Sequence, residues 1–251
     1  MAATLTEAWT PRVPLTAAER RVDFPLHNSH IVQRRLAVER AATPAARRLA
    51  YLVAEHGLPT QQVQLDLEGR LYVSLTRSVE FGYTQVRREL QGSRVAIRAA
   101  VRIPGVGDRG RVVLQGIAGI HGLVRSRAAV VARDVADAAT HAAHQAALDP
   151  GNTQVTTRLA VVVAVRRALH NDVLQLVGEA LNLGRAAGAE SVPNPPEYAM
   201  RSEQLDERTC DACDAAHGEI VRVGSSEYYD QMPPADCFGG GRCRGIYVYG
   251  D

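Results

Sequence analysis

Lysine is absent from this 251-residue chain, so all 29 of its basic residues are arginine, against 27 acidic residues. The resulting net charge of +2 is too small to indicate a nucleic-acid-binding protein by itself. A GC-rich genome would explain the arginine bias simply. The bias still makes every cationic contact a guanidinium, which suits phosphates and carboxylates. Without lysine, the chain also cannot form the phosphate-binding loop Gly-x-x-x-x-Gly-Lys.

Long apolar runs are also missing. The best candidate, Leu159 to Val165, is followed at once by Arg166 and Arg167, far short of the ~20 apolar residues that cross a bilayer. The segment from Met1 to Pro14 has no basic start followed by an apolar stretch. We therefore expect no signal peptide, no membrane partner and synthesis in a reducing cytoplasm, where cysteines bind metals more often than they form disulfides.

Recognisable catalytic patterns are absent as well. The chain has neither a Gly-x-Ser-x-Gly elbow nor a His-Glu-x-x-His pair. His141 and His144 lie one helical turn apart, but no carboxylate recurs at a matching spacing. We expect a protein that is not an enzyme and has no small-molecule substrate.

Aromatic residues make up only 5% of the chain, while alanine, valine and leucine are abundant. This composition favours helices packed through small side chains over a β-sandwich. We expect a mainly α protein with three parts: an N-terminal arm over residues 1–28, a body of long helices over 29–192, and a small cysteine-rich α+β module over 197–251. The spacer between the last two is the proline-rich run from Val192 to Pro196.

Helices are expected in the body from about Ser29, then from Thr43-Pro44 to Gly57, because proline suits the first turn of a helix and glycine its end. The next helix is predicted over 71–90. The stretch 61–69 alternates apolar and polar residues like a hairpin, but also fits a helical stripe, so both readings stay open.

Two longer helices are predicted over 123–148 and 153–187. A short turn joins them, which favours antiparallel packing. In the second of these helices, Leu159 and Val162 are expected to face the core.

All four cysteines lie in the last part of the chain, at Cys210, Cys213, Cys237 and Cys243. A Cys-x-x-Cys turn and a glycine-rich second loop can present four thiolates to one structural Zn²⁺, and a metal would supply folding energy to a segment with few apolar residues. Two local disulfides are the alternative. A redox site is disfavoured, because no βαβ pattern surrounds the first pair. His217 is a spare ligand that we leave out of the set.

The order of motifs around these cysteines resembles that of the phage head-morphogenesis family, the MuF-like minor capsid proteins. Asp206-Glu207-Arg208-Thr209-Cys210 and Cys213 precede a glycine turn at Gly218, then Pro233-Pro234, and finally Arg242-Cys243-Arg244. Two positions depart from the family pattern. Cys237 stands where many members have histidine, and the closing motif has one cysteine. The resemblance covers the chain from about Thr153 onward.

The resemblance implies a virion protein, made in the host bacterial cytoplasm and located in the phage head. Its expected partners are the portal protein and the capsid interior, and its expected roles are head assembly and DNA packaging or ejection. The alternative is a cellular zinc-ribbon protein that binds nucleic acid.

Between Ser93 and Ala132, seven arginines face a single acidic residue, Asp108. Arginine at this density suits a sequence-independent grip on packaged double-stranded DNA, and equally an acidic protein partner. The predicted contact residues are Arg94, Arg98, Arg102, Arg109, Arg111, Arg125 and Arg127.

Overall fold

The computed structural model describes residues 24–90, 108–203, 209–230 and 245–249, without the side chains of residues 24–27, 108–118, 229 and 230. Four long helices form the body: α1 (Phe24–His56), α2 (Gln61–Leu90), α3 (Asp108–Ala147) and α4 (Gln154–Glu190). The C-terminal part then contributes the following elements: β1 (Tyr198–Ser202), α5 (Asp211–Ala216), β2 (Ile220–Arg222), α6 (Ser226–Asp230) and β3 (Ile246–Tyr249). The expected mainly α architecture with a small sheet is therefore confirmed. Among the described helices, none is long and apolar enough to cross a membrane.

Helix α1 differs from the prediction at both its start and its middle. It begins at Phe24, inside the predicted N-terminal arm, and it runs without a break through Pro44, where we expected a new helix to start. Pro44 is exposed, so its ring points away from the core. The neighbouring Thr43 is also satisfied within the helix, since its Oγ1 donates to the Glu39 carbonyl at 2.6 Å. The helix ends at Gly57 as predicted, with a positive φ of 77°.

Helix α2 settles the ambiguous stretch 61–69 in favour of a helix. Val63 and Leu67 are buried and continue the stripe of Leu71 and Leu75, whereas Leu65 is 56% exposed. Buried residues therefore recur every four positions in this segment, as in a helix, and do not alternate with exposed ones as in a hairpin.

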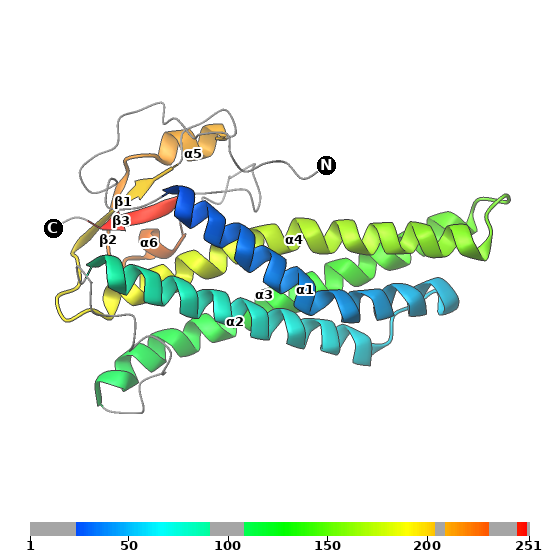
Figure 1. Ribbon diagram of the computed structural model, residues 1–251, viewed down its shortest axis with the longest axis horizontal. Coiled ribbons are helices and arrows are strands. Elements are labelled where there is room, and N and C mark those ends of the chain that lie inside the picture. Colours follow the sequence, from blue (N-terminus) through cyan, green and yellow to red (C-terminus); the bar gives the residue numbers. More distant parts are fainter. Residues whose placement is uncertain (1–23, 91–107, 204–208, 231–244, 250–251) are drawn as a thin grey trace.

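Helices α3 and α4 pack antiparallel, as expected, and the hairpin they form spans the length of the molecule (Figure 1). Thr153 caps α4: its hydroxyl accepts a hydrogen bond from the Thr156 N–H, and the Thr156 side chain accepts one from the Thr153 N–H. The prediction that Leu159 and Val162 face the core is wrong, because they are 63% and 43% exposed. Val161, one residue earlier than Val162, is buried in their place.

Helix α4 is the central element of the body, since it contacts α1, α2 and α3. One continuous core joins the four helices, and most of its members are alanine, valine and leucine. Small side chains let helices approach closely, which agrees with the low aromatic content of the chain.

The closest approach is between α2 and α4, and it depends on glycine. A Cβ at Gly82 would overlap the Leu181 carbonyl oxygen, and a Cβ at Gly184 would overlap that of Val79. A Cβ at Gly188 would overlap the Val86 side chain. Three glycines on two facing helices therefore let the two backbones touch, which no larger residue permits.

The sheet has the order β2-β1-β3 with antiparallel pairing throughout, and it lies against one end of the helical body (Figure 1). A second core cluster joins it to the helices through small residues of α2 and α4 and tyrosines of α6 and β3. Its buried members are Val86, Ala186, Ala189, Ala199, Val221, Tyr228, Tyr247 and Tyr249. The C-terminal part therefore shares a hydrophobic core with the ends of α2 and α4.

We predict that Gly184→Ala destabilises the protein by about 3 kcal/mol, because the added methyl group must push α2 and α4 apart. Gly69→Ala is the matched control, since it also lies inside a helix but a Cβ there meets no atom within 4 Å. The control should gain about 0.5–1 kcal/mol through helix propensity. Urea unfolding followed by circular dichroism measures both. Changes of the same sign would contradict the close-packed crossing.

Candidate functional site

The first two predicted zinc ligands lie at the start of α5. Cys210 occupies the position before the helix, with extended backbone and no side-chain capping bond, and its carbonyl accepts a hydrogen bond from the Asp214 N–H at 2.9 Å. Cys213 is buried in the first turn. Residues three apart at a helix start lie on the same side, so the pair can present two sulfurs to one ion.

The other two predicted ligands, Cys237 and Cys243, lie outside the described residues. Within the described ranges, no group of three or more His, Cys, Asp or Glu side chains is arranged to hold a metal. The described half of the predicted site has the donor chemistry of structural zinc.

The cysteine pair sits in a loop whose two ends are hydrogen-bonded to each other. The N–H of Arg201 donates to the Glu219 carbonyl at 2.7 Å, and the N–H of Gly218 donates to the Arg201 carbonyl at 2.8 Å. The N–H of Glu203 donates to His217 Nδ1 at 3.1 Å. The residues that begin and end the first part of the motif are therefore adjacent in space, and they close the loop that carries both cysteines.

His217 has a role in this closure that the sequence does not indicate. Because its Nδ1 accepts a backbone hydrogen bond, that nitrogen carries no proton and its lone pair is used. The neutral ring then keeps its proton on Nε2, so neither nitrogen offers a lone pair to a metal in this arrangement.

A buried ion pair lies beside the loop. Arg201 and Glu203 are 0% and 3% exposed, and Arg201 Nε donates to Glu203 Oε1 at 2.6 Å. Gly245 packs directly against the Glu203 carboxylate, where a Cβ would overlap the oxygens. Sequence analysis missed this pair. The sequence does place Arg201 and Glu203 two residues apart, a spacing that puts both side chains on the same face of a strand.

A second buried arginine joins the helices to the sheet. Arg185 of α4 is 1% exposed and donates to both carboxylate oxygens of Glu89 on α2, at 2.8 and 2.7 Å. It also donates to the Tyr247 carbonyl of β3 at 3.3 Å. Burial alone would lower the pKa of Arg185, but the Glu89 carboxylate more than offsets it, so the pKa is raised. The guanidinium therefore stays charged at every physiological pH.

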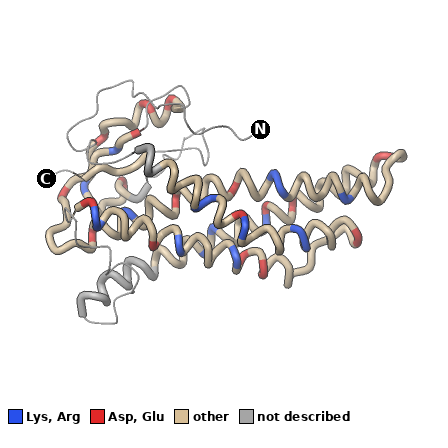
Figure 2. Tube along the Cα trace, viewed as in Figure 1, with Lys and Arg blue, Asp and Glu red and all other residues tan. Residues whose placement is uncertain are grey.

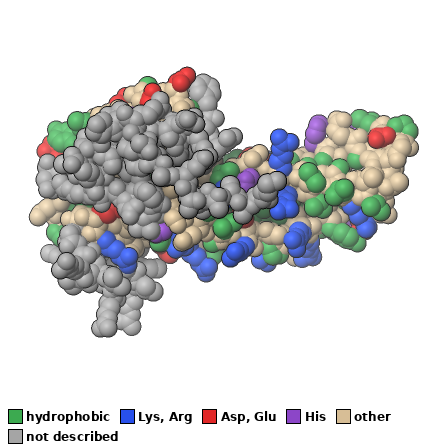
Figure 3. Space-filling view, turned by 45° about the horizontal axis from the view of Figure 1, so that its top comes forward, with side chains coloured by type: hydrophobic (Ala, Val, Ile, Leu, Met, Phe, Trp, Pro, Cys, Tyr) green, Lys and Arg blue, Asp and Glu red, His purple; other side chains and the backbone are tan. Residues whose placement is uncertain are grey.

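The arginines predicted for phosphate contact are only partly described. Arg94, Arg98 and Arg102 lie outside the described residues, and the side chains of Arg109 and Arg111, at the start of α3, are not described either. The remaining two are exposed and paired with acids of the same chain: Arg125 Nε lies 3.9 Å from Glu68, and Arg127 Nε lies 3.2 Å from Glu179. Exposed arginines occur instead along the whole helical body (Figures 2 and 3).

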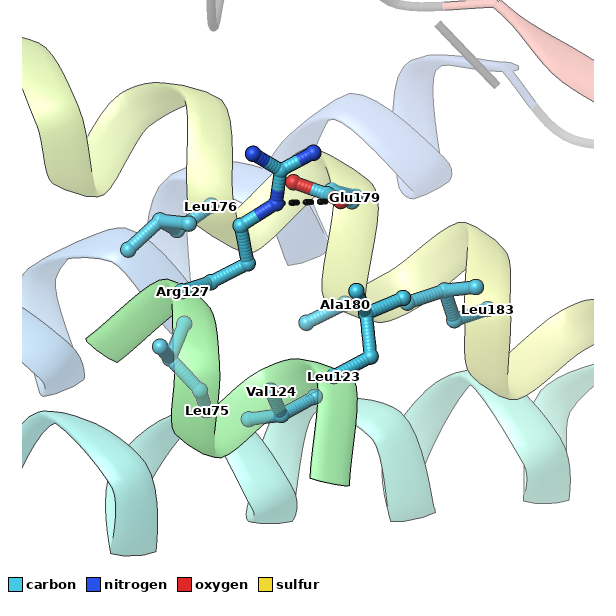
Figure 4. Close-up of a pocket in the computed structure, with 8 residues that line it drawn as sticks. All are labelled: Leu75, Leu123, Val124, Arg127, Leu176, Glu179, Ala180 and Leu183. Carbon is cyan, nitrogen blue, oxygen red and sulfur yellow. Dashed lines mark hydrogen bonds and ion pairs between the residues drawn. The ribbon is translucent and has the colours of Figure 1, made fainter. Parts of the chain in front are cut away.

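A small apolar depression lies where α2, α3 and α4 meet (Figure 4). Its cavity volume is about 10 Å³, room for about one water molecule, and the ion pair of Arg127 and Glu179 lies among the lining residues. Ligand pockets usually hold roughly 300–1,000 Å³ and bring several polar groups together. Leu75, Leu123 and Leu176 dominate this lining, which favours a packing defect between helices over a ligand site.

Three tyrosines are packed between the sheet and the helices. Tyr228 stacks on Tyr247 with ring centroids 4.7 Å apart, and its hydroxyl shares a 2.6 Å hydrogen bond with that of Tyr249. Burial raises the pKa of Tyr247 to about 12 and also raises that of Tyr249. The Tyr247 hydroxyl is buried and has no hydrogen-bond partner among the described residues.

In comparisons with known proteins, no family model, no curated protein and no solved structure matches this chain significantly.

We predict that the protein loses stability as the pH rises from about 10 to 12. The folded-state pKa of Tyr247 exceeds the unfolded value of about 10, so the folded state holds this proton more tightly, and its contribution is complete below pH 10 and lost above it. No lysine titrates in this range to obscure the effect.

Tyr247→Phe should shift the alkaline unfolding midpoint to higher pH without lowering stability at pH 8, because the lost hydroxyl makes no hydrogen bond. Tyr198→Phe is the control, since Tyr198 is 51% exposed and should change neither quantity. Thermal unfolding at a series of pH values measures both. An unchanged midpoint for Tyr247→Phe would show that this ionisation does not drive alkaline unfolding.

Proposed function

We propose that this chain is a minor head protein of a tailed phage or prophage, associated with the portal protein and the capsid interior. In this role it aids head assembly and DNA packaging or ejection, as a structural component and not as an enzyme. The observation that carries the proposal is the order of the MuF-like motifs, from Asp206 to Arg244.

The geometry of the first motif supports treating it as one unit. The residues that flank the Cys210–Cys213 pair, Arg201 to Glu203 and His217 to Glu219, are hydrogen-bonded to each other. The segments on the two sides of the cysteine pair therefore meet at the edge of the sheet.

The proposal includes one Zn²⁺ per chain, held by Cys210, Cys213, Cys237 and Cys243. By linking the four cysteines, the metal would stabilise the fold of a segment that is poor in apolar residues. The chain's own contribution would be to hold the first pair at the start of α5, in a segment whose flanking residues are hydrogen-bonded to each other. Packaged double-stranded DNA is a further partner in the proposal, through the arginines from Arg94 to Arg127.

The virion role predicts where the protein is found. Induced phage particles from the source strain should contain the chain in few copies by quantitative mass spectrometry. External protease should not digest it until the heads are opened, because it lies inside the capsid. Particles from a strain in which this gene is deleted are the control, because they should lack the peptides assigned to this chain. Finding the chain only in the cell fraction, bound to nucleic acid, would contradict the virion role and favour the cellular zinc-ribbon alternative.

The metal is tested independently on the purified recombinant protein. Elemental analysis should find about one zinc per chain, and Cys237→Ser should lose it together with protection of the C-terminal amides from exchange. The same zinc content in Cys237→Ser and the parent would exclude the four-cysteine site, without affecting the virion role.

A further inference from the structure

A long basic surface runs along α1 and α4. No acidic residue occurs in α1 from Arg40 to Ala54, or in α4 from Gln154 to Asn171. Two ion pairs bracket this region where the two helices cross: Glu39 with His170 at 2.9 Å, and Glu55 with Arg158 at 2.8 Å. The two acid-free stretches therefore lie side by side.

Exposed arginines occupy both stretches, and none of them forms an ion pair with a described carboxylate. These arginines are Arg40, Arg47, Arg48, Arg166 and Arg167. Elsewhere in the body, Arg70, Arg125 and Arg127 each have an acidic neighbour in the same chain. Five such arginines on two neighbouring helices concentrate positive charge on this part of the surface, although Arg158 in the α4 stretch is paired with Glu55.

Apolar side chains are exposed on the same part of α4. Val155, Leu159, Val162 and Val163 are 74%, 63%, 43% and 56% exposed. Figure 3 shows hydrophobic and basic side chains interleaved over this part of the body. We refer to these four residues and the five arginines above as the basic–apolar face.

The exposed apolar residues continue a seam that is buried farther along the same helix. Spacings of three and four lead from Val155, Leu159 and Val162 through Arg166 to Leu169, Val173 and Leu176, and the last three are all buried. In Figure 1 the α3–α4 hairpin extends beyond the start of α2. The first half of the seam therefore has the residue pattern of a helix-packing surface but no α2 to cover it.

We infer that the basic–apolar face docks an amphipathic helix of another protein, whose apolar stripe is flanked by aspartate or glutamate. Such a helix would cover the exposed half of the seam as α2 covers the buried half. Its carboxylates would meet guanidiniums that form no ion pair with a described carboxylate, in the fork geometry that arginine favours. The inference goes beyond the proposed virion role and does not depend on it.

Charge and chemistry argue against two other occupants of this face, a second copy of the chain and double-stranded DNA. A second copy of this chain would bring another five arginines and no carboxylate from these stretches to the same interface, so the face is not complementary to itself. Double-stranded DNA would satisfy the guanidiniums but would leave four exposed aliphatic side chains against phosphates. An acidic amphipathic helix is complementary to both components.

The test uses designed helical peptides as probes for binding to the full chain. One fluorescein-labelled peptide carries a leucine stripe flanked by glutamate, and its partner carries the same stripe flanked by lysine. Fluorescence anisotropy should show binding of the glutamate peptide, weakened by salt, and much weaker binding of the lysine peptide. Arg166→Glu with Arg167→Glu should weaken binding of the glutamate peptide by about tenfold or more, as should Leu159→Gln with Val163→Gln.

Matched controls change similar exposed residues elsewhere. Val73→Gln on α2, where the side chain is 49% exposed, and Arg133→Glu on α3 should leave binding unchanged. Circular dichroism checks that every variant is folded. Three results would overturn the inference: no binding of the glutamate peptide, equal binding of both peptides, or equal weakening by the controls. It would also be overturned by a dimer that Leu159→Gln dissociates in sedimentation, or by preferential binding of random-sequence duplex DNA.

Discussion

The fork between the buried Arg185 and the partly buried Glu89 is the interaction on which the arrangement of the two halves depends. One guanidinium binds a carboxylate of α2 through two hydrogen bonds and reaches a backbone carbonyl of β3. The glycines make this geometry possible. Gly184 and Gly188 flank Arg185 on α4 and bring the α2 backbone into contact, which places Glu89 within reach. A buried charge pair adds little net stability over an apolar pair but is costly to break, so its clearest effect is to specify one docking of sheet on helices.

Sequence reasoning predicted the elements that have a strong local pattern. Helical periodicity identified most of α2, α3 and α4, and Gly57 marked the end of α1 correctly. It failed where tertiary context decides. Pro44 was expected to start a helix, yet an exposed proline is tolerated inside one. Leu159 and Val162 fit the apolar stripe of α4, but no helix covers them.

The candidate site shows the same limit. The spacing of Cys210 and Cys213 predicts two sulfurs on one side of a turn, and in the structure the two residues lie at the start of α5. Nothing in the sequence pairs Arg185 with Glu89, because the contact joins residues of different helices. The charge density between Arg94 and Arg127 was visible in the sequence, whereas the basic–apolar face requires α1 and α4 to be placed side by side. Local charge composition therefore located one basic segment and missed the surface that the fold assembles.

A double-mutant cycle on Arg185→Met and Glu89→Gln tests most directly whether this fork fixes the sheet on the helices. Glu89→Gln leaves the buried Arg185 guanidinium without its carboxylate and should cost about 3 kcal/mol in urea unfolding, and Arg185→Met should cost less, because Glu89 is 23% exposed. The double variant should cost less than the sum by about 2 kcal/mol. Hydrogen exchange of the β3 amides, Ile246 to Tyr249, should rise in the single variants before that of the α1 and α3 amides. Additive costs, with β3 protected as in the parent protein, would contradict the central place given to this ion pair.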